Sequence, residues 1–168
     1  MKFAREILTT GSVVLLLAGP AICLAQAPLS AALAAKIIDG CSERAKSRGQ
    51  SHAIAVYDAG GHPVAFLRMD GNAPGIAEFA MQKAEAVAQW HFSTAEMSVA
   101  ARETPGFANA PHVVTVAGGV PIFSADGKEF LGAVGVSGEA PADDAACAQA
   151  GVKAAGLSSS SRTADPVR

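Results

Sequence analysis

The chain has little charge and no cluster of like charges. Only 17% of its residues are Asp, Glu, Lys or Arg, and the net charge is −2 at pH 7. The Lys and Arg residues are scattered, which argues against the basic surface that nucleic-acid binding needs. Half of the residues are apolar, and 168 residues are enough for one domain with a buried core. We therefore expect a single globular domain with no nucleic-acid partner.

The common catalytic and metal-binding motifs are also missing. The sequence has no P-loop, no nucleophile elbow and no G-x-G-x-x-G loop. It has no C-x-x-C or H-x-x-x-H pair, so a structural zinc site is not expected. The adjacent Asp143 and Asp144 indicate a helix N-terminus rather than an acid/base pair. For each of the four histidines a surface or turn position is the ordinary expectation: His52, His62, His91 and His112.

The first 25 residues have the pattern of a secretory signal peptide. Lys2 and Arg5 precede an apolar stretch that ends in small residues around Ala25. The alternative is an uncleaved anchor, but the apolar run is short for a bilayer. We expect cleavage after Ala25, a periplasmic or secreted protein, and no stable membrane insertion after cleavage. Export implies an oxidising compartment.

Two cysteines, Cys41 and Cys147, would remain after cleavage. They can form a disulfide if the first and last helices are neighbours. Equally, each can be a small buried apolar residue. The sequence leaves both alternatives open.

Hydrophobic periodicity and turn residues predict an α+β fold. Its mostly antiparallel sheet has five strands and is covered by helices, in the order α-β-β-α-β-β-β-α. Ser30 is the expected N-cap of the first helix. We expect a signal peptide over 1–25, the domain over 26–157 and a disordered tail over 158–168. The expected helices are 29–48, 76–90, a short one at 94–102, and 141–155; the expected strands are 52–58, 63–69, 111–117, 120–123 and 130–136.

A few polar residues lie where a ligand could bind. Lys83 follows Phe79 by four positions, close to the apolar face of its helix. A lysine there usually extends its stem along the apolar surface toward water, and it can alternatively hold an anion in a pocket. The glycine bends at Gly118-Gly119 and Ser137-Gly138 could form an anion-binding nest of backbone N–H groups.

Haem is a cofactor that needs no clustered motif. The porphyrin supplies four nitrogens, so a single His, Thr or Met completes the iron site. The protein must add an apolar slot and one or two cations for the propionates. Arg68, Lys83 and Arg102 are the cations near apolar runs.

Four stretches carry a resemblance to a known family. They are IAVYDAGGHPVAFLRMDG, AEFAMQKAEAVA, VAGGVPIF and LGAVGVSGEAPADDAACAQAGVKA. In order and spacing they resemble the GlcG/HbpS-like haem-binding family, over about residues 30 to 156. The resemblance implies a compact α+β domain with a five-stranded antiparallel sheet, and assembly as a homodimer or larger homo-oligomer. It also implies haem binding, which in some relatives is linked to haem sensing, storage or degradation.

The resemblance also suggests site residues. A hydroxyl a few residues after the Lys83 helix can ligate haem iron, and Thr94 occupies that place. Here the family often has Gly-Arg-Pro where this chain has His91-Phe92-Ser93, so His91 becomes a second candidate iron ligand. Arg68 is expected near a pocket and a subunit interface, pairing with Asp70 or a helix end. The candidate haem-binding residues are Thr94, His91, Lys83, His112, Arg68, Gly118 and Gly119, with Thr94 and His91 at the iron.

Three functions follow from these observations. The first is an exported haem- or tetrapyrrole-binding protein. The second is an accessory protein or enzyme acting on a small organic acid or diol-derived metabolite. The third is a non-catalytic oligomeric module. We expect the first, and a binding protein rather than an enzyme.

Overall fold

The computed structural model describes residues 29–162 of the chain. The predicted signal peptide therefore lies outside the described residues and stays a prediction. Among residues 29–162, no helix is both long and apolar enough to cross a membrane. The elements are α1 (Ala31–Ser47), β1 (Ala53–Asp58), β2 (Pro63–Arg68), α2 (Pro74–Trp90), α3 (Thr94–Glu103), the short 3-10 helix η1 (Phe107–Asn109), β3 (Gly119–Phe123), β4 (Phe130–Ser137) and α4 (Pro141–Ala154).

The described strands form one antiparallel sheet in the order β2-β1-β4-β3. β1 and β4 are the central strands, paired from Ala53 opposite Ser137 to Asp58 opposite Gly132. Every β1 residue except Asp58 is buried. The α+β class is thus confirmed, with four strands where five were expected.

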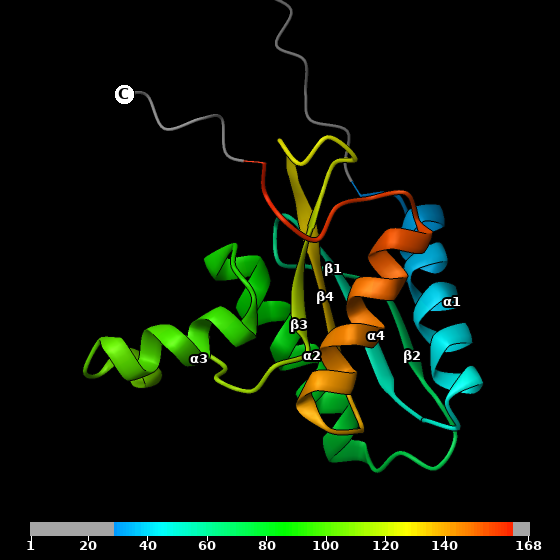
Figure 1. The fold of residues 1–168 in the computed structure, drawn as a ribbon, viewed down its shortest axis with the longest axis horizontal. Coiled ribbons are helices and arrows are strands. Elements are labelled where there is room, and N and C mark those ends of the chain that lie inside the picture. Colours follow the sequence, from blue (N-terminus) through cyan, green and yellow to red (C-terminus); the bar gives the residue numbers. More distant parts are fainter. Residues whose placement is uncertain (1–28, 163–168) are drawn as a thin grey trace, which may run out of the picture.

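Helices cover both faces of the sheet (Figure 1). α1 and α4 pack on one face, where alternate β1 residues such as Ile54 and Val56 meet them in an apolar core. α2 packs on the other face, against Ala53 and Ala55. This division follows from the alternation of side chains along a strand. α3 and η1 extend from the α2 side of the body (Figure 1).

The helix ends agree with local sequence signals. The Ser30 hydroxyl accepts a hydrogen bond from Leu33 N at 3.2 Å, which confirms the predicted N-cap of α1. Ser93 and Glu96 form a reciprocal capping box at the start of α3. His91 ends α2 in the left-handed conformation, with φ of 62°. α2 and α3 are therefore joined by a sharp turn at His91-Phe92-Ser93.

The predicted strand at 111–117 is wrong. This segment runs as a loop, and His112 near its start has φ of 58°, which breaks an extended run. Trp90 Nε1 donates to Pro111 O at 3.0 Å, so that carbonyl is used by a side chain and not by a strand ladder. Val113 and Val114 pack against the α2 core. These two valines therefore reach the core without joining the sheet, whereas Val116 is exposed.

The expected disordered tail differs from the structure in its first residues. Ser158 forms a β-bridge with Phe123, and Arg162 N donates to Gly127 O at 2.8 Å. Residues 158–162 thus lie along the β3–β4 hairpin. Backbone hydrogen bonds to this hairpin hold residues 158–162 in place. The composition of the tail does not reveal these contacts, because they involve backbone atoms of distant residues. Residues 163–168 lie outside the described part.

A disulfide joins Cys41 of α1 to Cys147 of α4. Of the two alternatives that the sequence left open, the structure has the disulfide. α1 and α4 are neighbouring helices (Figure 1), and both cysteines are fully buried between them. The cross-link spans 106 positions of the chain.

Removing this cross-link should destabilise the protein. A loop of about this length is worth roughly 5 kcal/mol of unfolded-state entropy. We expect the double variant Cys41→Ala/Cys147→Ala to lose about 2–5 kcal/mol of unfolding free energy, measured by denaturant titration. The oxidised wild-type protein is the control. Equal unfolding free energies for both proteins would contradict the prediction.

Candidate functional site

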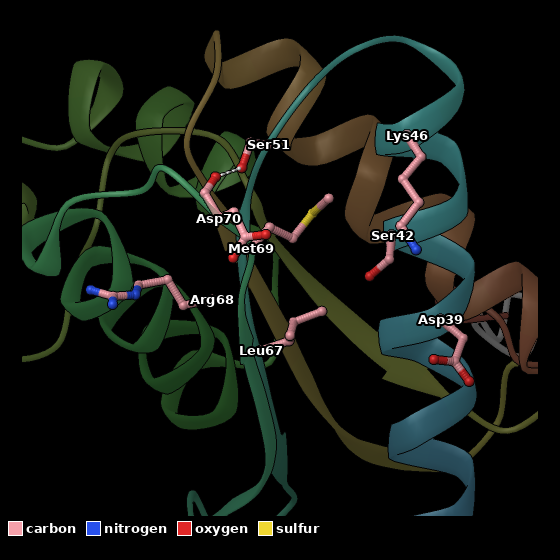
Figure 2. Close-up of a pocket in the computed structure, with 8 residues that line it drawn as sticks. All are labelled: Asp39, Ser42, Lys46, Ser51, Leu67, Arg68, Met69 and Asp70. Carbon is pink, nitrogen blue, oxygen red and sulfur yellow. Dashed lines mark hydrogen bonds between the residues drawn. The ribbon is translucent and has the colours of Figure 1, made fainter.

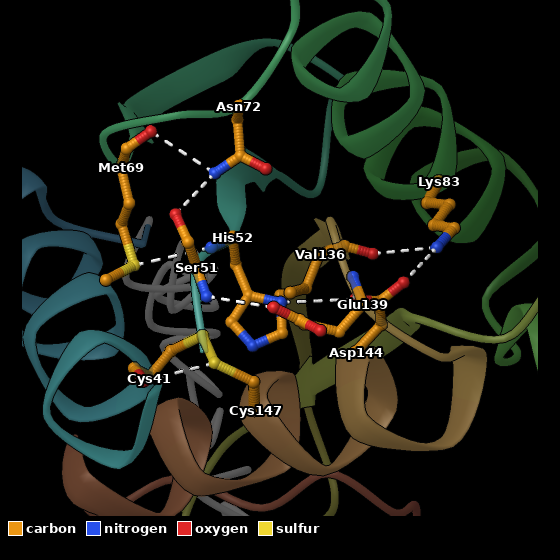
Figure 3. A network of polar contacts seen from close by, with 10 residues as sticks. All are labelled: Cys41, Ser51, His52, Met69, Asn72, Lys83, Val136, Glu139, Asp144 and Cys147. Carbon is orange, nitrogen blue, oxygen red and sulfur yellow. Dashed lines mark hydrogen bonds and ion pairs between the residues drawn. A yellow bond between two sulfur atoms is a disulfide. The ribbon is translucent and has the colours of Figure 1, made fainter. Parts of the chain in front are cut away.

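A cluster of three polar side chains is buried at one end of the sheet (Figure 3). Lys83, Asp144 and His52 are each at most 2% exposed. Lys83 Nζ lies 2.9 Å from Asp144 Oδ2 and donates to Val136 O at 2.8 Å. His52 Nδ1 lies 3.2 Å from Asp144 Oδ1. Asp144 Oδ1 also accepts a hydrogen bond from Glu139 N at 3.1 Å. The carboxylate is therefore the centre of the cluster.

Three elements position these side chains. Lys83 belongs to α2, on one face of the sheet, while Asp144 lies in the first turn of α4 on the other. His52 directly precedes β1 and alternates with Ile54 and Val56, so its ring faces the α1 and α4 side. The long Lys83 side chain reaches past the end of β4 to meet Asp144. The cluster thus connects the two helical layers around the sheet.

The environment of Lys83 changes its acid/base behaviour. Burial lowers the pKa of the Lys83 ammonium group below its usual value, because desolvation penalises the charged form. The hydrogen bond and charge of Asp144 oppose this shift. The Nζ atom also lies 4.8 Å from the centre of the Phe79 ring. Lys83 therefore neither extends to water nor presents an open anion site, in contrast to both expectations from the sequence.

The bend at Gly118-Gly119 packs directly on this cluster. Gly118 has φ of 132°, and a Cβ there would lie 2.6 Å from Lys83 Nζ. A Cβ on Gly119 would lie 2.6 Å from Thr94 Cγ2. Neighbouring atoms lie so close to the backbone at both positions that a side chain would not fit, which explains why both residues are glycine. The same holds at Gly138, where a Cβ would lie 3.0 Å from His52 Cα. In this structure the glycine bends serve packing, which argues against the predicted anion nest.

Thr94 is fully buried, in the first position of α3. Its Oγ1 accepts a hydrogen bond from Gly119 N at 2.9 Å, which fixes the start of α3 to the glycine bend. A ligand could not reach this hydroxyl without moving α3 or the bend. The geometry therefore disfavours Thr94 as an iron ligand.

His91 has a different environment. Its exposed imidazole stacks on the Phe130 ring, with 4.0 Å between ring centres. Among the described residues, neither of its ring nitrogens has a hydrogen-bond or ion-pair partner. The ring borders a hollow of about 300 Å³. Residues lining this hollow are His91, Phe92, Glu96, Pro121, Phe123 and Ser159 to Ser161.

Two other candidates lie elsewhere. His112 Nδ1 pairs with Glu85 Oε1 at 3.2 Å, and both side chains are partly exposed. Arg68 is an exposed residue at the end of β2 and forms no ion pair with Asp70 or any other described residue. The predicted pairing of Arg68 is therefore wrong. The structure brings together Lys83, Thr94, Gly118 and Gly119, and separates His91, His112 and Arg68 from them.

Arg68 is one of the residues that border a second hollow, of about 530 Å³, between α1 and the end of β2. Figure 2 shows Leu67 and Met69 directed from β2 toward Ser42 and Lys46 on α1, whereas Arg68 points the other way. Alternation along β2 explains this difference. Arg68 is therefore poorly placed to hold an anion inside that hollow.

Sequence reasoning missed Asp144 and His52. Asp144 was interpreted as a helix-terminus residue, and His52 as a surface or turn residue. Two signals were available: Lys83 on an apolar helix face needs a buried partner, and His52 continues the alternation of buried β1 residues. Neither signal identifies which carboxylate meets the lysine, because residues 83 and 144 are far apart in the chain.

Comparison with known proteins now identifies the family. The sequence model of the family described as "Haem degrading protein HbpS-like" matches residues 29–153. The chain belongs to the HbpS-like family. The resemblance expected from the sequence is thus confirmed, and the matched region covers α1 to nearly the end of α4.

Individual relatives agree with this assignment. Protein GlcG of Escherichia coli K12 is 40% identical over 120 residues, which are 65% of this chain and 81% of GlcG. A crystal structure of HbpS has a TM-score of 0.70 at 27% identity, covering 82% of this chain and 97% of that one. A crystal structure of a PduOC–haem complex has a TM-score of 0.73 at 24% identity, covering 80% and 99%. The last likeness shows the fold alone.

Breaking the buried ion pair of this HbpS-like domain should be costly. Lys83→Met keeps a long side chain but leaves Asp144 without its cation. Loss of one partner of a buried pair costs about 3–5 kcal/mol. We expect that loss in unfolding free energy, measured by denaturant titration. Lys128→Met removes an exposed lysine and is the matched control, with no measurable change expected. Equal effects of the two substitutions would contradict the prediction.

Stability should also depend on pH through Lys83. Its pKa is lowered in the folded state, so between that lowered value and about 10.5 the unfolded chain binds more protons. The contribution of Lys83 to unfolding free energy should therefore rise with pH in this range, by at most about 1.4 kcal/mol per pH unit.

The variant Lys83→Arg isolates this contribution, because an arginine keeps its charge throughout the range. We expect a smaller pH slope of unfolding free energy for this variant than for the wild type, in denaturant titrations from neutral to alkaline pH. Lys128→Arg should keep the wild-type slope. Identical slopes for all three proteins would show that Lys83 does not titrate in this range.

Proposed function

We propose that this HbpS-like protein binds haem, or a closely related tetrapyrrole, with His91 as an iron ligand. The observation that carries the proposal is the exposed His91 imidazole, which stacks on Phe130 at the edge of a hollow lined by Phe92, Pro121 and Phe123. Family membership supports the choice of ligand. HbpS, a solved structure with the same fold, supports it as well.

The chemistry of His91 and of the apolar lining fits the group, whereas the lining contains Glu96 and no lysine or arginine, so the propionates would need cations from outside this hollow. An unpaired imidazole nitrogen is a good iron ligand, and the porphyrin needs only one or two such ligands from the protein. Phe92, Pro121 and Phe123 offer apolar contacts to the porphyrin face. Stacking on Phe130 limits rotation of the imidazole and so favours one orientation. Haem, when bound, would supply an iron centre capable of redox change and further ligand binding.

Thr94 does not share this role in the proposal. Its hydroxyl is buried and accepts a hydrogen bond from Gly119. This chain has His91-Phe92-Ser93 where the family often has Gly-Arg-Pro. The residue that offers a free ligand atom, His91, therefore lies where this chain differs from that pattern. Lys83 is likewise excluded as a propionate partner, because Asp144 and Val136 O occupy its ammonium group.

The size of the hollow suggests a second copy of the chain. At about 300 Å³ it lies at the lower end of the range for ligand pockets, roughly 300–1,000 Å³. One subunit would therefore cover only part of a tetrapyrrole. We extend the proposal to a homodimer or larger homo-oligomer in which a second copy covers the remainder. Export to the periplasm or beyond, and a role in haem sensing, storage or degradation, are further parts of this proposal.

Haemin titration of the full chain tests the proposal. We expect a saturable, red-shifted Soret band at about one haem per subunit or per subunit pair. His91→Ala should raise the Kd for haemin by about tenfold or more, or abolish the shifted band. A tenfold rise in Kd corresponds to a loss of about 1.4 kcal/mol of binding free energy. Thr94→Val should retain the band, despite some loss of stability from the unpaired Gly119 N–H.

His62→Ala is the matched control, because His62 is an exposed histidine in the β1–β2 turn. It should bind haem as the wild type does. Loss of the band in Thr94→Val with retention in His91→Ala would assign the ligand to Thr94 instead. A featureless, non-saturating titration of the wild type would overturn haem binding altogether.

A further inference from the structure

Residues 158–162, the C-terminal wall, border the hollow beside His91. The serines at 159–161 line this hollow together with the residues of the proposed haem site. The wall follows α4 and lies along the β3–β4 hairpin (Figure 1). It also lies beyond residue 153, where the match to the family model ends. Family membership therefore does not account for the presence of this wall.

Backbone contacts hold the C-terminal wall at both ends. At one end, Phe123 N donates to Ser158 O at 2.8 Å, and Ser158 N donates to Phe123 O at 3.1 Å. At the other end, Arg162 N donates to Gly127 O at 2.8 Å. Gly127 has φ of 76°, and a Cβ there would lie 2.9 Å from Arg162 N, so this close approach needs a glycine. The residues between the two anchors, 159–161, are thereby held at the hollow.

The wall offers hydrogen-bond donors that are not used elsewhere. Among the described residues, the hydroxyls of Ser159, Ser160 and Ser161 have no hydrogen-bond partner. Arg162 is exposed and forms no ion pair with another described residue. Consecutive Cα atoms lie about 3.8 Å apart, so the long Arg162 side chain begins next to the hollow. Its guanidinium group is always positively charged and carries only donors.

The remaining lining is unsuited to an anionic group. Apart from His91, it consists of Glu96 and apolar residues. Glu96 Oε2 accepts hydrogen bonds from Ser93 N at 2.7 Å and from the Ser93 hydroxyl at 2.6 Å, so this carboxylate is part of the α3 cap. A carboxylate of a ligand is repelled by Glu96, because the two charges have the same sign. The unpaired donors of the C-terminal wall attract it.

We infer that the C-terminal wall is the carboxylate-binding side of the haem site. The hydroxyls of Ser159, Ser160 and Ser161 and the guanidinium of Arg162 bind the haem propionates. This inference rests on the proposed function, since it concerns the same ligand. Arg162 provides the cation that the lining of the hollow lacks, and a guanidinium can bind a carboxylate through two parallel N–H donors. The apolar lining and the polar wall together orient a ligand that has an apolar face and an acidic edge.

Titrations of the full chain with two ligands test the inference. The ligands are haemin and haemin dimethyl ester, in which both carboxylates are methyl esters without charge. The variant Ser159→Ala/Ser160→Ala/Ser161→Ala/Arg162→Gln keeps the backbone anchors and removes the polar side-chain groups of the wall. We expect this variant to raise the Kd for haemin by about fivefold and to leave the Kd for the ester unchanged. The Soret absorbance gives both constants.

Ser47→Ala/Arg48→Gln is the matched control, because it removes an exposed serine and an exposed arginine at the end of α1. It should bind both ligands as the wild type does. If the wild type binds haemin and the wall variant has the same Kd, or if its Kd rises equally for haemin and the ester, the inference is overturned while haem binding stands. A wild type that binds neither ligand would overturn the proposed function and this inference with it.

Discussion

The ion pair between Lys83 and Asp144 is the interaction on which much of this structure depends. It joins α2, on one face of the sheet, to α4, on the other. Two charges buried this deeply are tolerated only when each is paired and hydrogen-bonded, and Val136 O, Glu139 N and His52 provide the additional partners. The pair therefore constrains the end of β4, the first turn of α4 and the residue before β1 at once.

The glycine bend transmits this constraint to α3. Gly118 packs on Lys83 Nζ, and Gly119 N binds the Thr94 hydroxyl at the start of α3. Ser93 and Glu96 cap the same helix end. These contacts fix the turn at His91-Phe92-Ser93 from one side, while Phe130 stacks on His91 from the other. The side chain that we propose as iron ligand thus belongs to a turn fixed by the buried network and by the exposed Ser93–Glu96 cap, of which Glu96 also lines the hollow.

The polar network is satisfied at all but one of its side-chain atoms named here. Its lysine and carboxylate hold the helical layers together. Its histidine has one buried nitrogen, Nε2, without a hydrogen-bond partner.

The helices, the β1–β2 hairpin, the Ser30 cap and the family could be predicted from the sequence, because these depend on local periodicity, turn chemistry and motif order. The sequence also identified Lys83, Thr94 and the two glycines as unusual. The partners of these residues became known from the three-dimensional structure: Asp144 for Lys83, Gly119 for Thr94, and Cys147 for Cys41. It also placed residues 111–117 in a loop, from which Val113 and Val114 reach the core without strand pairing. Contacts between residues distant in the chain follow from how the layers pack, which no local pattern encodes.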